Sequence, residues 1–235
     1  MHPALLASMF VALPIVAAAW VSRSDPNERY VKLLLAFSGA FLLTVTVVHM
    51  LPELYVGHPS TIGAWVMAGF MLQVVLEFFS HGIEHGHVHV HRHPDHRLPL
   101  TTLLSLFVHS FTEGMPFADA AVRANGSFVA GVLMHKAPMA IALATVLRRS
   151  QVPSSRSWAM IAVFALALPA GMGAGFLGGD RSGGAFLASA LAVAIGMLLH
   201  ISTTIIFEST PDHRFNAKRF VTVLAGAALA FLSMH

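Results

Sequence analysis

Long apolar stretches dominate this chain, with only short polar segments between them. A helix needs about 20 apolar residues to cross the hydrocarbon core of a bilayer, and each stretch is long enough to do so. The sequence therefore predicts an all-α integral membrane protein in which residues 1–235 form a single transmembrane domain. The eight expected transmembrane helices cover residues 3–21, 31–55, 62–80, 98–122, 126–148, 157–178, 184–207 and 217–234.

The composition excludes a soluble domain of this length. Hydrophobic residues make up 56% of the chain, charged residues make up 11%, and the mean hydropathy is +0.70. The first apolar stretch lacks a basic segment before it and is followed closely by the second, so we expect a helix rather than a signal peptide. The basic sequence pI would suit a nucleic-acid partner, but in a membrane protein it indicates basic loops, and we expect no nucleic acid.

Lysine and arginine are distributed unevenly between the loops. The loops after the odd-numbered helices hold eleven of the fourteen, whereas the loops after the even-numbered helices hold only Arg123 and Arg181. Short loops rich in these residues face the cytoplasm. We therefore expect a multi-pass protein of the cell (inner) membrane, embedded in the lipid bilayer with both termini outside the cytoplasm.

The expected cytoplasmic loop at residues 81–97 is rich in histidine. Alternating His-x-His in a polar loop is typical of weak, exchangeable binding of divalent transition metals through neutral imidazole. We therefore predict that the loop captures or senses metal, with a merely solvated linker as the alternative. Its histidines are His81, His85, His87, His89, His91, His93 and His96.

Ionisable side chains lie in the middle of the expected fourth and fifth helices. His109 and Glu113 are four residues apart, and His135 and Met139 repeat that spacing, so each pair shares one helix face. Ionisable groups within a membrane are expensive and mark a functional site by default. The chain has no cysteine, so only His and Met could serve as soft-metal ligands. We therefore predict that His109, Glu113 and His135 bind one transition-metal ion, with Met139 as a candidate fourth ligand. The alternative is that His109 and Glu113 only join helices by hydrogen bonds.

Lys136 directly follows His135 in the expected fifth helix. A protonated amine has no lone pair and cannot bind a metal, but the ammonium can reach the space beside the metal. We expect Lys136 to pair with Glu113 when the site is empty and to repel a second divalent ion. The alternative is a lysine that only bridges helices.

Further candidate ligands lie at the two ends of the expected pathway. His49 and Glu53, four residues apart at the end of the second helix, would form an outer mouth. Glu208, at the end of the seventh helix, would form the exit. His200, in the same helix, either lines the pore or hydrogen-bonds a neighbouring helix.

Two other acidic residues are weaker candidates. Asp119 lies off the His109 face of its helix and near the outer boundary, where water can solvate it. Glu77 ends the third expected helix, and we expect its side chain to reach the cytoplasmic surface.

Several of these features together resemble the ZIP family of divalent metal transporters. They are the eight helices with both ends outside, the histidine-rich third loop, "HSFTEG" at 109–114 and "HKAP" at 135–138. Glu53 in "MLPEL" and Glu208 resemble the carboxylates of that family at the two ends of its pathway. The resemblance implies a bundle in which helices 1–3 and 6–8 are related by inverted pseudo-symmetry around helices 4 and 5. It also implies uptake into the cytoplasm by alternating access.

The sequence departs from the family pattern where some members hold a second metal. Ser110 and Lys136 stand where those members have Asn and a carboxylate, and Met139 stands where a ligand carboxylate is common. The sixth expected helix contains no acidic residue. We therefore predict a single central metal site.

The expected function is transport of Zn²⁺, with Fe²⁺, Mn²⁺ and Cd²⁺ as alternatives because affinity alone rarely selects among these ions. No prosthetic group is expected, and the sequence leaves a homodimer open. The rival is an intramembrane zinc-dependent hydrolase in which His49, His109, His135 and His200 would hold a catalytic metal with an open water position. Such an enzyme would not need Glu208, a lysine beside a ligand or a histidine-rich loop, so we do not expect an enzyme.

Overall fold

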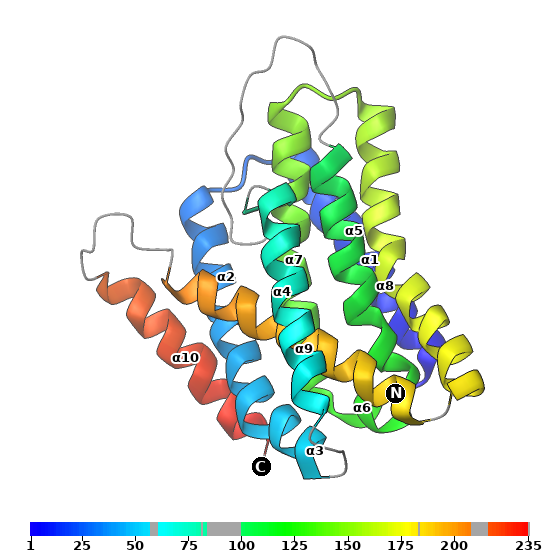
Figure 1. Ribbon diagram of the computed structural model, residues 1–235. Coiled ribbons are helices and arrows are strands. Elements are labelled where there is room, and N and C mark those ends of the chain that lie inside the picture. Colours follow the sequence, from blue (N-terminus) through cyan, green and yellow to red (C-terminus); the bar gives the residue numbers. More distant parts are fainter. Residues whose placement is uncertain (57–60, 81, 84–99, 183, 208–215, 235) are drawn as a thin grey trace.

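The computed structural model describes residues 1–56, 61–80, 82–83, 100–182, 184–207 and 216–234, and every regular element in these ranges is a helix (Figure 1). A π-helical turn, η1 (Thr46–Met50), joins the second helix to the third, and a 3-10 turn, η3 (Met115–Ala118), follows the fifth. The α-helices are α1 (Pro3–Arg23), α2 (Glu28–Val45), α3 (Leu51–Val56), α4 (Ile62–Ser80), α5 (Leu100–Gly114), α6 (Ala120–Ala124), α7 (Gly126–Arg149), α8 (Ser154–Ser182), α9 (Gly184–Phe207) and α10 (Ala217–Ser233).

Six of the described helical stretches are long and apolar enough to cross a membrane. They are α1, the continuous stretch from α2 through α3, and α4, α7, α8 and α9. The remaining long helices are shorter, with 15 residues in α5 and 17 in α10. The helices agree with the prediction of an all-α membrane protein.

The expectation of one uninterrupted helix over residues 98–122 is wrong, because the helix breaks after Gly114. The α-helix stops at Gly114, and the chain continues through η3 to Asp119, whose backbone is extended (φ −76°, ψ 134°). Pro116 has no N–H to continue the helical hydrogen bonds, which favours a break at this point. Asp119 then caps α6 by accepting a hydrogen bond from the amide of Ala121 (2.8 Å).

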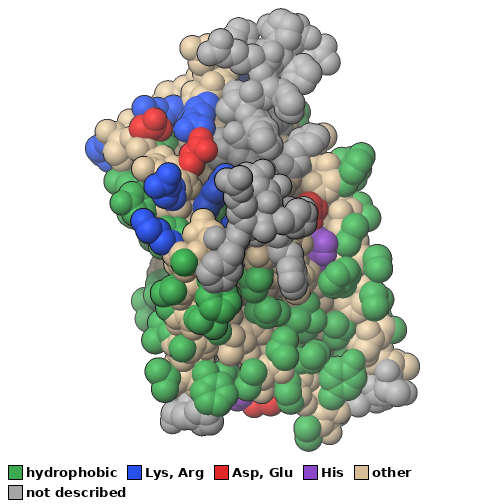
Figure 2. Space-filling view, turned by 90° about the vertical axis from the view of Figure 1, so that its left-hand side faces the viewer, with side chains coloured by type: hydrophobic (Ala, Val, Ile, Leu, Met, Phe, Trp, Pro, Cys, Tyr) green, Lys and Arg blue, Asp and Glu red, His purple; other side chains and the backbone are tan. Residues whose placement is uncertain are grey.

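Both chain ends lie at one end of the bundle, here called the terminal end (Figure 1). The amine of Met1 donates to the carbonyl of Arg123 (3.3 Å), and the hydroxyl of Ser127 donates to the carbonyl of Ser233 (2.9 Å), so both termini meet the region where α7 begins. The opposite end is the basic end, where Lys and Arg side chains gather above an apolar belt (Figure 2). The described basic residues in the helix ends that lie here are Arg23, Arg29, Lys32, Arg148, Arg149, Arg156, Lys218 and Arg219.

Glycines allow α5 and α8 to pack backbone against backbone. A Cβ atom at Gly114 of α5 would collide with the carbonyl of Leu168, and a Cβ atom at Gly171 of α8 would collide with the carbonyl of Phe111. Small residues at such contacts are typical of membrane helices. The contact fixes the end of α5 that carries the predicted metal ligands.

Two other helix pairs use the same kind of close approach. Gly69 of α4 lies against the backbone of Val193 on α9, and Gly226 of α10 lies against the backbone of Phe37 on α2. The most extensive contact of α4 is with α9, that of α10 is with α2, that of α5 is with α8, and that of α7 is with α1. The long helices thus form two sets, one of α1, α5, α7 and α8 and the other of α2, α4, α9 and α10.

Candidate metal centre

His109 and Glu113 lie on one face of α5, as their spacing predicts. Nε2 of His109 is 3.1 Å from Oε1 of Glu113, and the two residues are 0% and 2% exposed. Neither group reaches solvent or lipid. The pair therefore presents an imidazole and a carboxylate to the interior of the bundle.

His135 of α7 joins this pair in a cluster of three. Ligand atoms from His109, Glu113 and His135 all lie within 4.8 Å of one another, and the two imidazole rings meet edge to face with their centroids 6.2 Å apart. Zn²⁺ binds imidazole nitrogen and carboxylate oxygen at about 2.0–2.2 Å, so three donors this close can share one ion after small side-chain shifts. The structure thus brings three of the four predicted central residues together.

Met139, the fourth predicted central ligand, is fully buried one turn further along α7. Its side chain belongs to an apolar cluster that includes Leu106 of α5, Phe164 of α8 and Ile201 of α9. Met139 therefore has a packing role in this structure, and metal binding through its sulfur stays a prediction.

Lys136 is fully buried beside the cluster. Its Nζ lies 3.7 Å from Oε2 of Glu113 and 4.7 Å from the centroid of the Phe164 ring. Lys136 therefore pairs with Glu113, as expected, and the aromatic face adds a cation–π contact. Because Glu113 faces His109 with one oxygen and Lys136 with the other, its carboxylate lies between a candidate metal ligand and a fixed positive charge.

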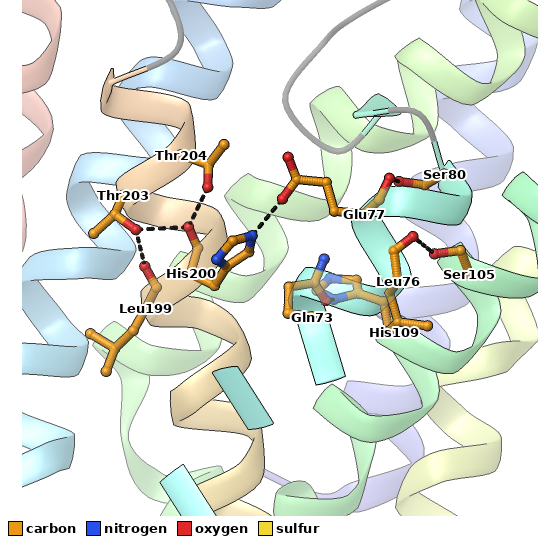
Figure 3. A network of polar contacts seen from close by, with 10 residues as sticks. All are labelled: Gln73, Leu76, Glu77, Ser80, Ser105, His109, Leu199, His200, Thr203 and Thr204. Carbon is orange, nitrogen blue, oxygen red and sulfur yellow. Dashed lines mark hydrogen bonds and ion pairs between the residues drawn. The ribbon is translucent and has the colours of Figure 1, made fainter. Parts of the chain in front are cut away.

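Gln73 of α4 is a residue of this site that the sequence pattern did not single out. It is fully buried, and its Oε1 lies 3.1 Å from Nδ1 of His109 (Figure 3). The available signal was a lone amide in an apolar helix, because a buried amide is costly unless it has a hydrogen-bond partner. The identity of that partner depends on tertiary packing and could not be read from the sequence.

The predicted outer-mouth residues lie at the terminal end of the bundle. His49 belongs to η1, and its Nε2 is 3.6 Å from Oε1 of Glu53 on α3. Glu53 and Asp119 both line a pocket of about 280 Å³, together with Asn125. The pocket therefore carries two carboxylates at the end of the bundle where the chain termini lie.

His200 of α9 is hydrogen-bonded through Nε2 to the carboxylate of Glu77 on α4 (Figure 3). Of the two alternatives for His200, a bond to a neighbouring helix is the one observed. We expected the Glu77 side chain to reach the cytoplasmic surface. It is only 21% exposed and contacts His200 instead. The hydroxyls of Thr203 and Thr204 donate to the carbonyl of His200 (2.8 and 2.9 Å), within the same helix.

The other predicted metal-binding residues fall outside the described part of the chain. Glu208, the expected exit carboxylate, follows the last described residue of α9. The histidine-rich segment is likewise not described, so the structure does not test its ligands, which are His85, His87, His89, His91 and His93.

Comparison with known proteins identifies the family. Residues 98–234, more than half of the chain, match the family model described as ZIP zinc transporter. The chain belongs to the ZIP family. The matched part of this ZIP protein contains α5, α7 and all three residues of the buried cluster. A curated relative, zinc transporter ZIP9 of Micropogonias undulatus, is 30% identical over 153 residues, which cover 61% of this chain and 48% of that protein. The chain thus spans about half the length of this curated relative.

Membership of the ZIP family confirms the resemblance seen in the sequence motifs. The family is one of transporters, so membership also agrees with the expectation that this protein is not an enzyme. The intramembrane hydrolase is therefore not favoured. Helices α1 to α4 precede the matched segment, so their roles rest on their contacts with the matched helices.

Proposed function

We propose that this ZIP protein transports Zn²⁺ across the membrane through a single central site formed by His109, Glu113 and His135. The observation that carries the proposal is the buried cluster itself, whose ligand atoms lie within 4.8 Å of one another inside a bundle of apolar helices. Two imidazoles and a carboxylate at one place inside a membrane protein are costly unless they serve a cation.

The donor set supports Zn²⁺ as the main substrate. Imidazole nitrogen and carboxylate oxygen are common zinc ligands, and water or Met139 would complete a four-coordinate shell. Fe²⁺, Mn²⁺ and Cd²⁺ suit the same donors, and we propose them as secondary substrates because affinity rarely separates these ions. The metal is the transported substrate, and no prosthetic group is proposed.

Lys136 supports a single ion rather than two. Its ammonium lies 3.7 Å from Oε2 of Glu113, the oxygen that does not face His109 and that a second ion would need as a ligand. A fixed positive charge there repels a second divalent cation and neutralises Glu113 when the site is empty. In this proposal the Lys136 ammonium stays beside the site, whereas the transported Zn²⁺ binds and leaves.

The ends of the pathway are proposed from their carboxylates. At the terminal end, the pocket lined by Glu53 and Asp119 would collect metal, with His49 beside it. At the basic end, Glu208 would receive the metal on its way out. The histidine-rich loop 81–97 would bind metal weakly after release and sense its level.

Eight crossings are proposed, with α5 and α10 added to the six long spans. α7 begins beside Ser233 at the terminal end and ends where Arg148 donates to the carbonyl of Val21 at the basic end (2.8 Å). α4 runs in the same direction as α7, and the chain returns through α5 between them (Figure 1). α10 likewise runs from the basic end to the terminal end. Because basic loops face the cytoplasm, we place both termini outside the cytoplasm of a cell (inner) membrane.

The packing supports the inverted pseudo-repeat. In that repeat α1, α2 and α4 correspond to α8, α9 and α10, and α5 corresponds to α7. The contact of α4 with α9 then corresponds to that of α10 with α2, and the contact of α5 with α8 corresponds to that of α7 with α1. Gly69 against α9 and Gly226 against α2 repeat the same close approach.

Alternating access is proposed as movement of the two helix sets against each other. All three ligands lie on α5 and α7, which belong to the set with α1 and α8. Rigid-body movement of this set past the other would expose the site first to one side and then to the other, with net transport into the cytoplasm. A homodimer is compatible with this movement and is not required by it.

Counting metal inside sealed vesicles tests the proposal. Purified wild-type protein reconstituted into vesicles should accumulate Zn²⁺, and His109→Ala should not. Ser105→Ala is the matched control, because it removes a hydroxyl one turn away on α5 and leaves the cluster intact. A wild type that accumulates no metal while cleaving a substrate would replace the transporter with the hydrolase.

A further inference from the structure

Two hydrogen bonds join α4 to α5 next to the cluster. Gln73 Oε1 meets Nδ1 of His109 at 3.1 Å, and one turn earlier on α5 the hydroxyl of Ser105 donates to the carbonyl of Leu76 at 2.5 Å. The side chains of Gln73, His109 and Ser105 are all buried (Figure 3). Only the first of these bonds touches a candidate metal ligand.

The chemistry of imidazole makes this contact decisive for metal binding. A neutral imidazole has one N–H and one lone pair, and the hydrogen bond made by one nitrogen determines which nitrogen is free. Nε2 of His109 faces Glu113 at 3.1 Å and is the nitrogen that belongs to the cluster. Nδ1 must therefore carry the proton if Nε2 is to bind metal, and a carbonyl oxygen is the acceptor that holds it there.

The amide nitrogen of Gln73 makes no interaction comparable to the one between its oxygen and His109. In the described part of the chain its Nε2 has no hydrogen-bond partner, although the residue is fully buried. A buried amide group without a partner is destabilising, so an aliphatic side chain of the same size would pack at lower cost. The contact with His109 is the interaction that offsets this cost.

We infer that Gln73 is a positioning residue, which holds His109 in the tautomer and ring orientation that present Nε2 to the transported metal. The inference rests on the proposed central site. Hydrogen-bond acceptors behind a metal-binding histidine orient the ring and raise the basicity of the ligand nitrogen. Gln73 supplies this acceptor from α4, a helix that contributes none of the three clustered ligands.

Substitutions at Gln73 test the inference on the purified full-length protein. Gln73→Met keeps most of the volume and removes the acceptor, whereas Gln73→Glu keeps an acceptor oxygen at the same place. Zn²⁺ affinity is measured by competition with a chromophoric chelator, and His109→Ala defines the background from the other histidines. We expect Gln73→Met to weaken binding about 10- to 100-fold, and Gln73→Glu to bind at least as tightly as the wild type.

Ser105→Ala is the matched control, because it removes the other α4–α5 hydrogen bond without touching His109. We expect its Zn²⁺ affinity to stay within about twofold of the wild type, since an outer-shell effect requires contact with a ligand. An equal loss in Ser105→Ala and Gln73→Met would overturn the inference, because both losses would then reflect helix packing. Unchanged affinity in Gln73→Met would overturn it as well.

If the Gln73 variants do not fold, a measurement on the wild type still tests the inference. In ¹⁵N NMR of the zinc-loaded wild type, His109 should bind metal through Nε2 and carry its proton on Nδ1, with the signal assigned by its loss in His109→Ala. Binding through Nδ1 would overturn the inference alone. A wild type that binds no Zn²⁺ above the His109→Ala background would overturn the proposed central site together with it.

Discussion

Replacing Lys136 with Met should destabilise the metal-free protein. The change removes the ammonium and little volume from a fully buried position. Nζ of Lys136 lies 3.7 Å from Oε2 of Glu113, and at an effective dielectric of about 20 two unit charges at that distance attract each other by ~4 kcal/mol. Removing one partner of a buried ion pair costs about 3–5 kcal/mol because the other charge is left uncompensated. We therefore expect the free energy of unfolding to fall by about 3–4 kcal/mol.

The same substitution should strengthen Zn²⁺ binding. The metal then supplies the positive charge that Glu113 has lost and no longer meets a neighbouring cation, so we expect the affinity to rise about tenfold, equivalent to about 1.4 kcal/mol. Reversible unfolding in SDS, with and without Zn²⁺, measures both effects. Lys136→Glu should go further and admit a second ion, counted by metal analysis of the purified protein.

A double-substitution cycle separates the ion pair from packing. Gln at position 113 removes the charge that Lys136 compensates, so the combined Lys136→Met and Glu113→Gln variant should recover most of the stability lost in Lys136→Met. If the free energy of unfolding falls by less than about 1 kcal/mol in Lys136→Met, Glu113 is not held as the charged partner of Lys136. Weaker Zn²⁺ binding to Lys136→Met than to the wild type would contradict repulsion between Lys136 and the bound metal.

Three further predictions concern the site, the loop and the helix contacts. His109→Ala and Glu113→Ala should each abolish Zn²⁺ uptake in folded protein, because each removes a metal ligand; uptake at the wild-type rate in either variant would exclude that role. Deleting residues 85–93 should leave uptake largely intact but change its response to cytoplasmic metal, and loss of uptake in correctly inserted protein would place the loop in the pathway. Gly171→Ala should lower the free energy of unfolding by about 1–3 kcal/mol through overpacking against the α5 backbone. Gly173→Ala, where nothing lies within 4 Å of the added Cβ, should be neutral or slightly stabilising, and equal effects in an unfolding assay would contradict the close contact.

Most of the helices and the pairing of His109 with Glu113 were predictable because they depend on local spacing, and His135 was expected to join them because it lies at a similar depth in the next expected helix. Apolar runs of sufficient length indicate membrane helices, and a spacing of four places His109 and Glu113 on one face wherever the helix sits. The positive charge of Lys136 beside a carboxylate was also predictable, because a buried charge requires a partner.

Features that depend on tertiary contacts could not be predicted. Pro138 lies inside α7 without ending it, whereas the chain leaves the α-helix near Pro116, so proline alone does not decide where a helix stops. The partners of Gln73 and Glu77 come from other helices, and the sequence gives no register between helices. The glycine contacts between α5 and α8 could not be predicted either, because they also depend on the register between two helices.

Anomalous diffraction at the zinc edge from crystals of the zinc-loaded protein is the sharpest test of the single central metal site. We expect one strong peak inside the bundle, about 2.0–2.2 Å from nitrogens of His109 and His135 and from a carboxylate oxygen of Glu113. Nζ of Lys136 should stay outside the coordination sphere. A second peak of equal height bridged by Glu113, or a peak that touches none of the three residues, would contradict the single central site.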